Sequence, residues 1–188
     1  MKRILGDTVP MNGISYIDSD NTPMDWTATS YTPKLVIETD GGTVTLAATA
    51  ITAHPTQTFT AEADDDYLTC NDHGVKEGNQ IVVANSGGAL PTGLSASTRY
   101  WPVNIGKNRF QLAASEGGGA INLTTDGTGT NTFYVVGSWQ ATNAQASLSS
   151  LTAQTYRAWV SAFSGATQVE TAPAMAAGFP IDVQAFGN

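Results

Sequence analysis

The chain has 188 residues, of which 41% are hydrophobic and only 13% are charged, against roughly 25% charged residues in an average domain. Its net charge is −8, with eight Lys and Arg residues in all, which argues against a nucleic-acid-binding surface. The length allows one large or two small domains, and the regular recurrence of large apolar residues argues against a disordered chain.

Short alternating segments separated by turn residues dominate the chain. In chain order, strands are predicted at 33–38, 43–46, 80–84, 100–105, 109–113, 122–124, 132–136, 156–163 and 181–183. Turns are predicted at 18–21, 40–42, 90–93, 106–108 and 164–165, where Gly, Pro, Asn and Asp gather. The segment 104–110 is predicted to be a hairpin in which Gly106 and Asn108 can accept positive φ. Helical signal is limited to a turn or two at 143–151. Strands at this spacing predict an all-β sandwich or barrel.

The two ends of the chain differ in amino-acid composition from its middle. Residues 1–58 and 136–188 contain Trp26, Trp139 and Trp159 and a modest amount of glycine, whereas 59–135 is rich in Gly and Asn. Either two domains follow one another, or one domain is interrupted by another at a loop. Insertion is tolerated at exposed loops because the two ends of an inserted domain lie close together.

The middle segment carries an ordered series of submotifs. After a strand and His73-Gly74 come V-x-x-G-x-x-I/V, then G-x-x-L-P-x-G-L-S-x-x-T-x-Y, then V-N-x-x-x-N-x-F-Q-L, and last G-G-x-I-N-L-T-T-D-G-T-G-T. Over about 70 residues this resembles a small β module that recurs in virion proteins of tailed phages, including tail and fibre components. The resemblance implies a building block with no catalytic role.

The flanks carry a second resemblance. LGDTVPMNGISYIDSDNTPMDW near the start and TYRAWVSAFSG with FPIDV near the end are similar to the immunoglobulin-like N-terminal domain of phage baseplate upper proteins. The resemblance implies an immunoglobulin-like β-sandwich at 1–58 and 136–188, interrupted by an inserted small β-sandwich or barrel module at 59–135. Trp26 and Trp159 are predicted anchors of the sandwich core.

The histidines and the cysteine are weighed as possible chemical groups. His73 follows Asp72, but neighbouring residues rarely act as base and orienting carboxylate, and no nucleophile motif accompanies them. His73 is therefore predicted to close a strand end, with Gly74 providing backbone freedom, and His54 is predicted in extended or turn conformation before Pro55. The single Cys70 excludes an intrachain disulfide and a cysteine-based zinc site. It is predicted to be a small buried hydrophobe.

Acidic and aromatic residues suggest two further kinds of site. Asp64-Asp65-Asp66 invites a calcium site, but consecutive residues of an extended chain point to opposite faces, so a solvated junction is predicted. Asp18 and Asp20 are predicted in a turn. Aromatic residues that could stack on sugars are Tyr31, Tyr100 and Trp101, of which one of Tyr100 and Trp101 must face inward. The basic residues Lys76, Arg99, Lys107 and Arg109 are predicted to be solvated loop charges.

We therefore predict no catalytic, cofactor-binding or metal-binding residues and no enzymatic activity. MKRILGDTVP lacks the apolar run of a signal peptide and no segment is long enough to span a membrane, so we expect synthesis in a host cytoplasm and no membrane insertion. The expected function is that of a structural protein of a tailed-phage virion: an accessory decoration, adaptor or baseplate-type component. Its expected partners are other capsid or tail proteins, in a homo-oligomer or in many copies on a symmetric particle. The alternative is a carbohydrate-binding host-adhesion module whose partner is a surface glycan.

Overall fold

The computed structural model describes residues 2–4, 11–14, 16–17, 22–26, 32–39, 42–46, 50–142, 155–164, 167–172 and 179–184. These residues form strands, turns and loops, so the predicted all-β class is confirmed for this part of the chain. Within it there is no helix that is long and apolar enough to cross a lipid bilayer.

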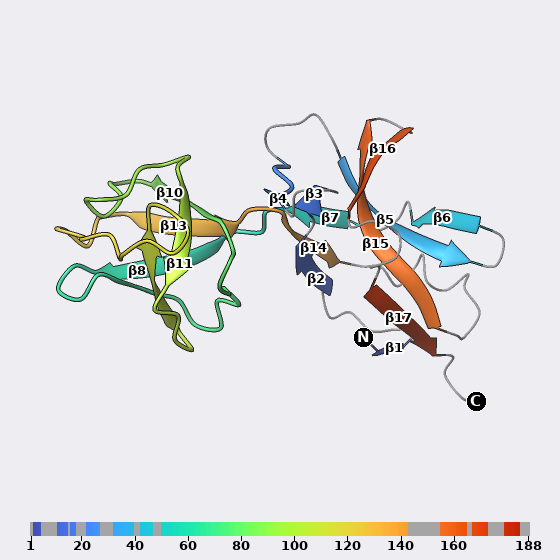
Figure 1. Cartoon of the computed structure of the whole chain (residues 1–188), viewed down its shortest axis with the longest axis horizontal. Coiled ribbons are helices and arrows are strands. Elements are labelled where there is room, and N and C mark those ends of the chain that lie inside the picture. Colours follow the sequence, from blue (N-terminus) through green and yellow to red (C-terminus); the bar gives the residue numbers. More distant parts are fainter. Residues whose placement is uncertain are drawn as a thin grey trace. The chain divides into compact units, whose positions relative to one another are not determined.

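The chain divides into two compact units. The first contains Met1–His54 and Gly137–Asn188, and the second contains Pro55–Val136. The first unit is therefore made of two segments that are far apart in the sequence, and the second is one continuous segment between them (Figure 1).

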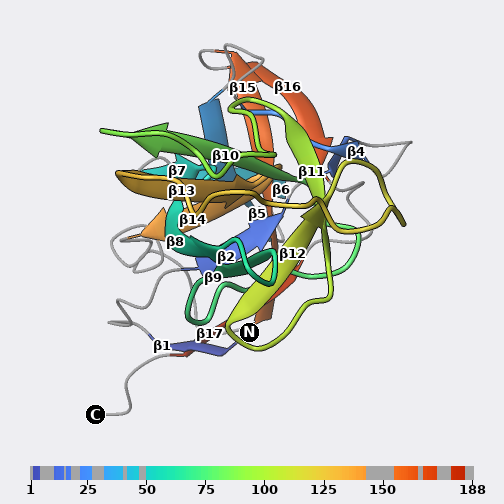
Figure 2. The same ribbon diagram turned by 90° about the vertical axis from the view of Figure 1, so that its left-hand side faces the viewer.

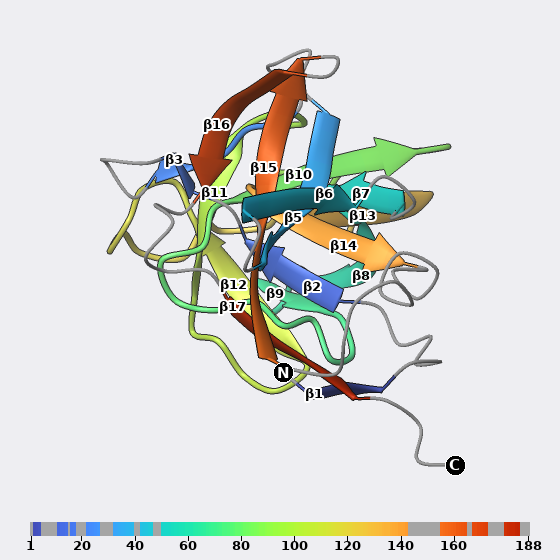
Figure 3. The same cartoon turned by 90° about the vertical axis from the view of Figure 1, so that its right-hand side faces the viewer.

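The largest sheet of the first unit has six strands in the order β1-β17-β15-β5-β6, with β16 also paired to β15 (Figure 3). The ten-residue β15 is its central strand: it pairs with β5 along one edge and with β17 and then β16 along the other. All pairs are antiparallel except β1 with β17. The strand bounds are β1 Lys2–Ile4, β5 Thr32–Thr39, β6 Gly42–Leu46, β15 Thr155–Ser164, β16 Thr167–Ala172 and β17 Phe179–Gln184.

A three-stranded sheet of the first unit joins the two segments of the chain. Its order is β2-β14-β7, with β2 at Met11–Ile14, β7 at Ala50–Ala53 and β14 at Ser138–Thr142. The last strand before the second unit, β7, thus pairs directly with the first strand after it, β14. A further pair joins β3 (Tyr16–Ile17) to β4 (Thr22–Pro23).

The second unit is a closed, fully antiparallel six-stranded barrel in the order β10-β11-β12-β9-β8-β13 (Figure 2). Six residue pairs between β10 and β13 close it, and β13 also pairs with β8. Closure leaves no strand edge free to pair with another chain. The strand bounds are β8 Gln57–Glu62, β9 Tyr67–Thr69, β10 Ile81–Ser86, β11 Arg99–Val103, β12 Arg109–Ala113 and β13 Thr130–Val135.

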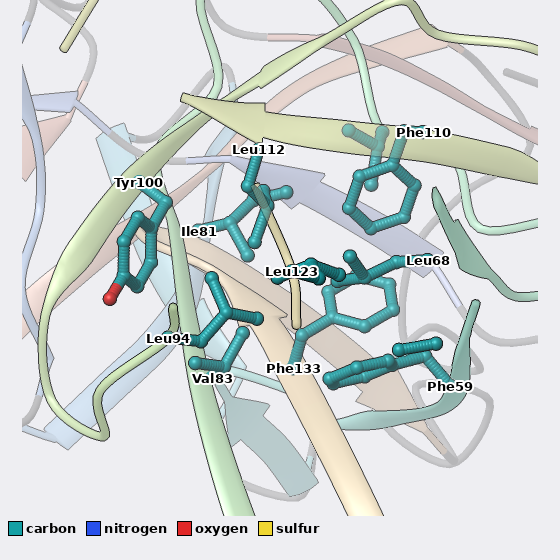
Figure 4. Close-up of a cluster of buried hydrophobic side chains, with 12 residues drawn as sticks. Phe59, Leu68, Ile81, Val83, Leu94, Tyr100, Phe110, Leu112, Leu123 and Phe133 are labelled. Carbon is teal, nitrogen blue, oxygen red and sulfur yellow. The ribbon is translucent and has the colours of Figure 1, made fainter. Parts of the chain in front are cut away.

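Alternating side chains of these strands fill the barrel. In β8, for example, Phe59 and Ala61 are buried while their neighbours Thr58, Thr60 and Glu62 are exposed, as a strand with one covered face requires. Figure 4 shows the resulting core, in which the Phe110 and Phe133 rings meet edge to face with their centres 5.3 Å apart. Its members are Phe59, Ala61, Leu68, Val75, Ile81, Val83, Leu94, Tyr100, Phe110, Leu112, Leu123 and Phe133.

Most of the predicted strands are present with shifts of one or two residues at their ends, but the strand predicted at 122–124 is wrong. Leu123 is buried in the barrel core, which explains its apolar signal. Its backbone N–H donates to the Asp66 carboxylate, and the neighbouring Ile121 and Thr124 N–H groups donate to carbonyls of two other segments. The segment is thus held by separate partners and forms no ladder with a neighbouring strand.

Two turns differ in detail from their predictions. Gly106 and Asn108 were predicted as the residues of the hairpin after β11 that can accept positive φ, whereas the residue with positive φ is Asn104, at 49°. The turn predicted at 90–93 is displaced by one residue, because the N–H of Leu94 donates to the carbonyl of Pro91. Predictions for 18–21, Tyr31, 40–41, 143–151 and 165, and for the side chain of Trp159, lie outside the described residues.

Candidate functional site

His73 is a buried residue whose two ring nitrogens both bond to backbone groups. Nδ1 accepts the N–H of Val75 at 3.0 Å, so the proton lies on Nε2, which donates to the carbonyl of Gly106 at 3.0 Å. The ring also packs on Phe110, with ring centres 5.0 Å apart. Gly74 follows with φ of 66°, as predicted for a turn. His73 therefore joins two loops to the core and has no nitrogen left to act as a base.

Two of the three aspartates at 64–66 bind groups of their own barrel, and all three lie in the turn between β8 and β9, so the predicted junction between domains is wrong. Asp65 accepts the N–H of Tyr67 at 3.2 Å and forms an ion pair with Arg109 at 3.2 Å. Asp66 accepts the N–H of Leu123 at 2.7 Å. In the described ranges no three His, Cys, Asp or Glu side chains come together as a metal site would require.

His54 lies where the chain leaves the first unit. It is buried, has φ of 48°, and its Nε2 accepts the N–H of Gly137 at 3.0 Å. Its own N–H donates to the carbonyl of Ser138 at 2.8 Å. The indole N–H of Trp26, also buried, donates to the carbonyl of Gly137 at 3.2 Å. These bonds hold together the two points of the first unit between which the barrel is inserted.

The four basic residues of the middle segment do not act as one patch. Arg109 lies over the ring of Tyr67, with its guanidinium carbon 4.1 Å from the ring centre, and pairs with Asp65. Arg99 donates to the side-chain oxygen of Gln80 at 3.0 Å. Two of the four guanidinium and ammonium groups are therefore already bound by neighbouring side chains.

Cys70 is half-buried, so the prediction of a buried hydrophobe is corrected. Its thiol donates to the side-chain oxygen of Gln57 at 3.3 Å. Burial raises the pKa of the thiol above its ordinary value, and the negative charge of Asp72 raises the pKa further. The thiol is therefore protonated and weakly nucleophilic at neutral pH.

Tyr100 and Trp101 lie on opposite faces of β11. Tyr100 is buried in the core, where its hydroxyl accepts the N–H of Ser95 at 2.7 Å. Trp101 is half-exposed and lines a pocket of about 480 Å³ on the outside of the barrel, which lies within the roughly 300–1,000 Å³ of ligand sites. We call this the Trp101 pocket; its lining residues are Glu77, Gly78, Trp101, Pro102, Val103, Asn104, Ile105, Glu116 and Gly117.

A larger, shallower depression of about 650 Å³ follows β8 and β9. Its outward side chains are mostly threonines, at positions 56, 58, 60 and 69, together with Asn71. The residues that line it include no charged side chain, and its single aromatic residue, Phe59, is buried in the core. The Trp101 pocket is therefore the stronger candidate for a binding site.

Comparison of the chain with protein-family models, with curated protein sequences and with solved structures finds no match. The coordinates by themselves define an all-β protein in which a closed barrel lies, along the chain, between two paired strands of another β unit.

The two glutamates of the Trp101 pocket are not among the site residues weighed from the sequence. A signal was present, because Glu-Gly occurs at the centre of two segments with turn-forming composition, KEGN at 76–79 and SEGG at 115–118. Their approach to one tryptophan depends on the pairing of strands that are far apart in the sequence, which no local pattern reports.

Proposed function

We propose that this chain is a non-enzymatic structural protein of a tailed-bacteriophage virion. In this proposal it is an accessory decoration, adaptor or baseplate-type component. The flanking unit, proposed to be an immunoglobulin-like sandwich, binds other virion proteins, and the inserted barrel, which occupies Pro55–Val136, is displayed. The resemblance of both segments to phage virion modules motivates the proposal.

The observation that carries the proposal is the pairing of β7 with β14 on either side of the barrel. Thr52 pairs with Gln140 and Ala53 with Trp139, so the flanking unit contains a continuous sheet into which the barrel is inserted as a loop would be. A protein built this way can vary or replace the displayed domain without altering its attachment domain.

The two units differ in how their strands can meet other proteins. The barrel has no free edge, whereas β6 of the six-stranded sheet pairs only with β5 among the described strands. An open edge can accept a strand from a neighbouring protein. Many copies on a symmetric particle would multiply such modest contacts by avidity.

The chemistry of the described residues favours a structural role. Both nitrogens of His73 are bonded to backbone groups, the Asp65 and Asp66 carboxylates hold their own barrel, and the raised pKa of Cys70 keeps its thiol protonated. Each of these four groups therefore has a structural partner or is held in its unreactive protonation state.

The experiment that tests the proposal is localisation on the particle. A cryo-EM map of virions, or immunogold labelling with an antibody to this chain, should place it in many copies on the capsid, neck or tail. Its absence from purified virions, together with failure of the purified protein to bind any virion component, would contradict the proposal.

A carbohydrate-binding host-adhesion module is the second candidate function. It now rests on Trp101, the member of the Tyr100-Trp101 pair that faces outward, because sugar rings stack on exposed indoles. A glycan array in which wild-type protein binds and W101A does not would favour it. The carboxylates of Glu77 and Glu116, which line the same pocket as the indole, favour a positively charged ligand over a neutral sugar.

A further inference from the structure

The rim of the Trp101 pocket is formed by two turns of the same design. In the turn at 76–79 the N–H of Asn79 donates to the carbonyl of Lys76, and in the turn at 115–118 the N–H of Gly118 donates to the carbonyl of Ser115. In both turns the second residue is a glutamate and the third is a glycine.

The glycines explain how both turns present a glutamate at the same position. Gly78 has φ of 78° and Gly117 has φ of 68°, which is the sign that a type II turn requires at its third residue. The residue before each glycine is then at the exposed corner of the turn. Glu77 and Glu116 occupy these two corners, are both exposed, and both line the pocket.

The two glutamates are free to bind an external cation. In the part of the chain that the structure describes, neither carboxylate takes part in an ion pair or hydrogen bond. Lys76 adjoins Glu77 in the sequence but does not line the pocket. Two negative charges therefore flank one cavity without an internal counter-charge.

Most of the remaining lining is apolar; its one polar side chain is that of Asn104, whose amide donates to the side-chain oxygen of Gln111. Trp101 and Val103 project from the outer face of β11, and Ile105 follows in the hairpin. An indole face attracts a cation more strongly than the other aromatic rings do, and aliphatic groups suit a hydrocarbon stem. The pocket thus combines an apolar floor for a chain of methylene groups with two carboxylates and an aromatic ring for its charged end.

This arrangement selects among the ligands that bind beside tryptophan. A quaternary ammonium has no N–H to donate and is held by a cage of several aromatic rings, whereas Trp101 is the single aromatic residue among those lining this pocket. A primary ammonium or a guanidinium donates charge-assisted hydrogen bonds to carboxylates. A neutral sugar would leave the two negative charges without a counter-charge.

We propose that the Trp101 pocket binds a lysine or arginine side chain of a partner protein. The stem lies along Trp101 and Val103, and the charged end lies between Glu77 and Glu116. The indole N–H, which has no acceptor among the described residues, is available to a backbone carbonyl of the same partner segment. This inference rests on the proposed function in one respect: it assumes that the basic side chain belongs to another protein.

The test uses the full chain labelled with 5-fluorotryptophan and observed by fluorine NMR. The chain has four tryptophans, and the variant W101F assigns the resonance of Trp101. The ligands are N-acetyl-lysine amide and N-acetyl-arginine amide, with N-acetyl-norleucine amide as the uncharged isostere. We expect saturable movement of the Trp101 resonance with the two basic ligands and none with norleucine.

The charge-removing variant E77Q/E116Q separates electrostatic recognition from stacking. It should weaken binding by about fivefold or more, since each lost pairing of exposed charges contributes up to about 1 kcal/mol. E62Q removes an exposed glutamate of β8 outside the pocket and should bind like the wild type. Because Trp26, Trp139 and Trp159 all belong to the first unit, folding of the barrel in each variant is shown by amide NMR signals of barrel residues outside the pocket that keep their wild-type positions.

Several results would overturn the proposal. These are no movement of the Trp101 resonance with either basic ligand, equal movement with norleucine, undiminished binding by E77Q/E116Q, or a response to choline or to methyl glycosides in place of the basic ligands. Localisation on virions is measured separately. Binding without localisation would contradict the proposed function and leave the pocket assignment standing, and localisation without binding would do the reverse.

Discussion

The imidazole Nε2 of His54 accepts a hydrogen bond from the backbone N–H of Gly137, 83 positions later in the sequence, at 3.0 Å. With the bond from the His54 N–H to Ser138, it fixes the strand ends between which the barrel is inserted. The buried His54 side chain thus links two positions that the chain itself connects only through the entire barrel.

Replacing His54 by alanine should loosen this junction. H54A removes the acceptor for a buried N–H, which costs about 1–3 kcal/mol. H54G should cost less than H54A, because glycine adopts a φ of 48° without the steric penalty that alanine pays. The measurements are urea unfolding of the full chain and amide hydrogen exchange at Gly137, which should accelerate in both variants. Wild-type exchange at Gly137 in H54A would show that the bond is unimportant.

Substitution of His73 should destabilise the barrel. H73A leaves the Val75 N–H and the Gly106 carbonyl without their partner and opens a cavity beside Phe110, for a combined cost of about 2–4 kcal/mol. Unfolding followed by the 5-fluorotryptophan resonance of Trp101, the tryptophan of the barrel, measures it. K107A, an exposed residue of the adjoining hairpin, should change stability by less than about 0.5 kcal/mol. Equal stability of the two variants would refute the structural role assigned to His73.

Two glycines with the same backbone angle allow steric crowding to be measured by itself. Gly127 and Gly87 both have φ of 76°, so alanine at either position costs about 1 kcal/mol of backbone strain. A methyl group at Gly127 would lie 2.7 Å from the carbonyl oxygen of Ala89 and from the nitrogen of Pro91, whereas at Gly87 it meets open space.

We therefore expect G127A to lose at least about 2 kcal/mol more than G87A, as overpacking against backbone typically does. Thermal unfolding of the two variants under identical conditions gives the difference. If both lose the same stability, the loops that meet at Gly127 are not packed as described.

The Cys70 thiol should react slowly with iodoacetamide near pH 8. Burial, and then the charge of Asp72, raise its pKa, so less thiolate is present than in the chain unfolded in urea. Because the folded state holds this proton more tightly, the associated stability is present at neutral pH and is lost as the pH rises through the folded pKa. D72N should accelerate alkylation by up to about threefold, since exposed charges are screened. D64N serves as the control, and equal rates for the two variants would remove Asp72 as a cause.

Residues 55–136, produced alone, should fold. The barrel closes through its own six strands and contains its own core, and its first and last strands pair with one another, Gln57 with Phe133. A dispersed amide NMR spectrum and cooperative thermal unfolding are the expected results. A collapsed, non-cooperative fragment would show that the barrel depends on the flanking unit.

The sequence by itself determined the class of the fold, eight of the seventeen strands in the described part of the chain and the distinct composition of the middle segment. Alternation with a period of two is a local signal, and burial of one face of each strand forces it on the chain. It predicted β12 at Arg109–Ala113 and showed that Tyr100 and Trp101 face opposite ways. Glycine before or after a polar residue marked most turns, although the position with positive φ was misplaced in the hairpin after β11.

Only the tertiary structure decided what the polar residues do. Strand pairing and barrel closure bring Asp66 to Leu123, His73 to Gly106, and Glu77 and Glu116 to one tryptophan. The hydrogen bond between His73 and Gly106 joins residues 33 positions apart, and the one between Asp66 and Leu123 joins residues 57 positions apart. The geometry of these contacts follows from the register of strands in a closed barrel. The local sequence pattern does not specify that register. The apolar pattern around Leu123 therefore predicted a strand, although the backbone of its segment bonds to several separate partners. For the same reason, the two Glu-Gly turns were visible in the sequence while the pocket that they border was not.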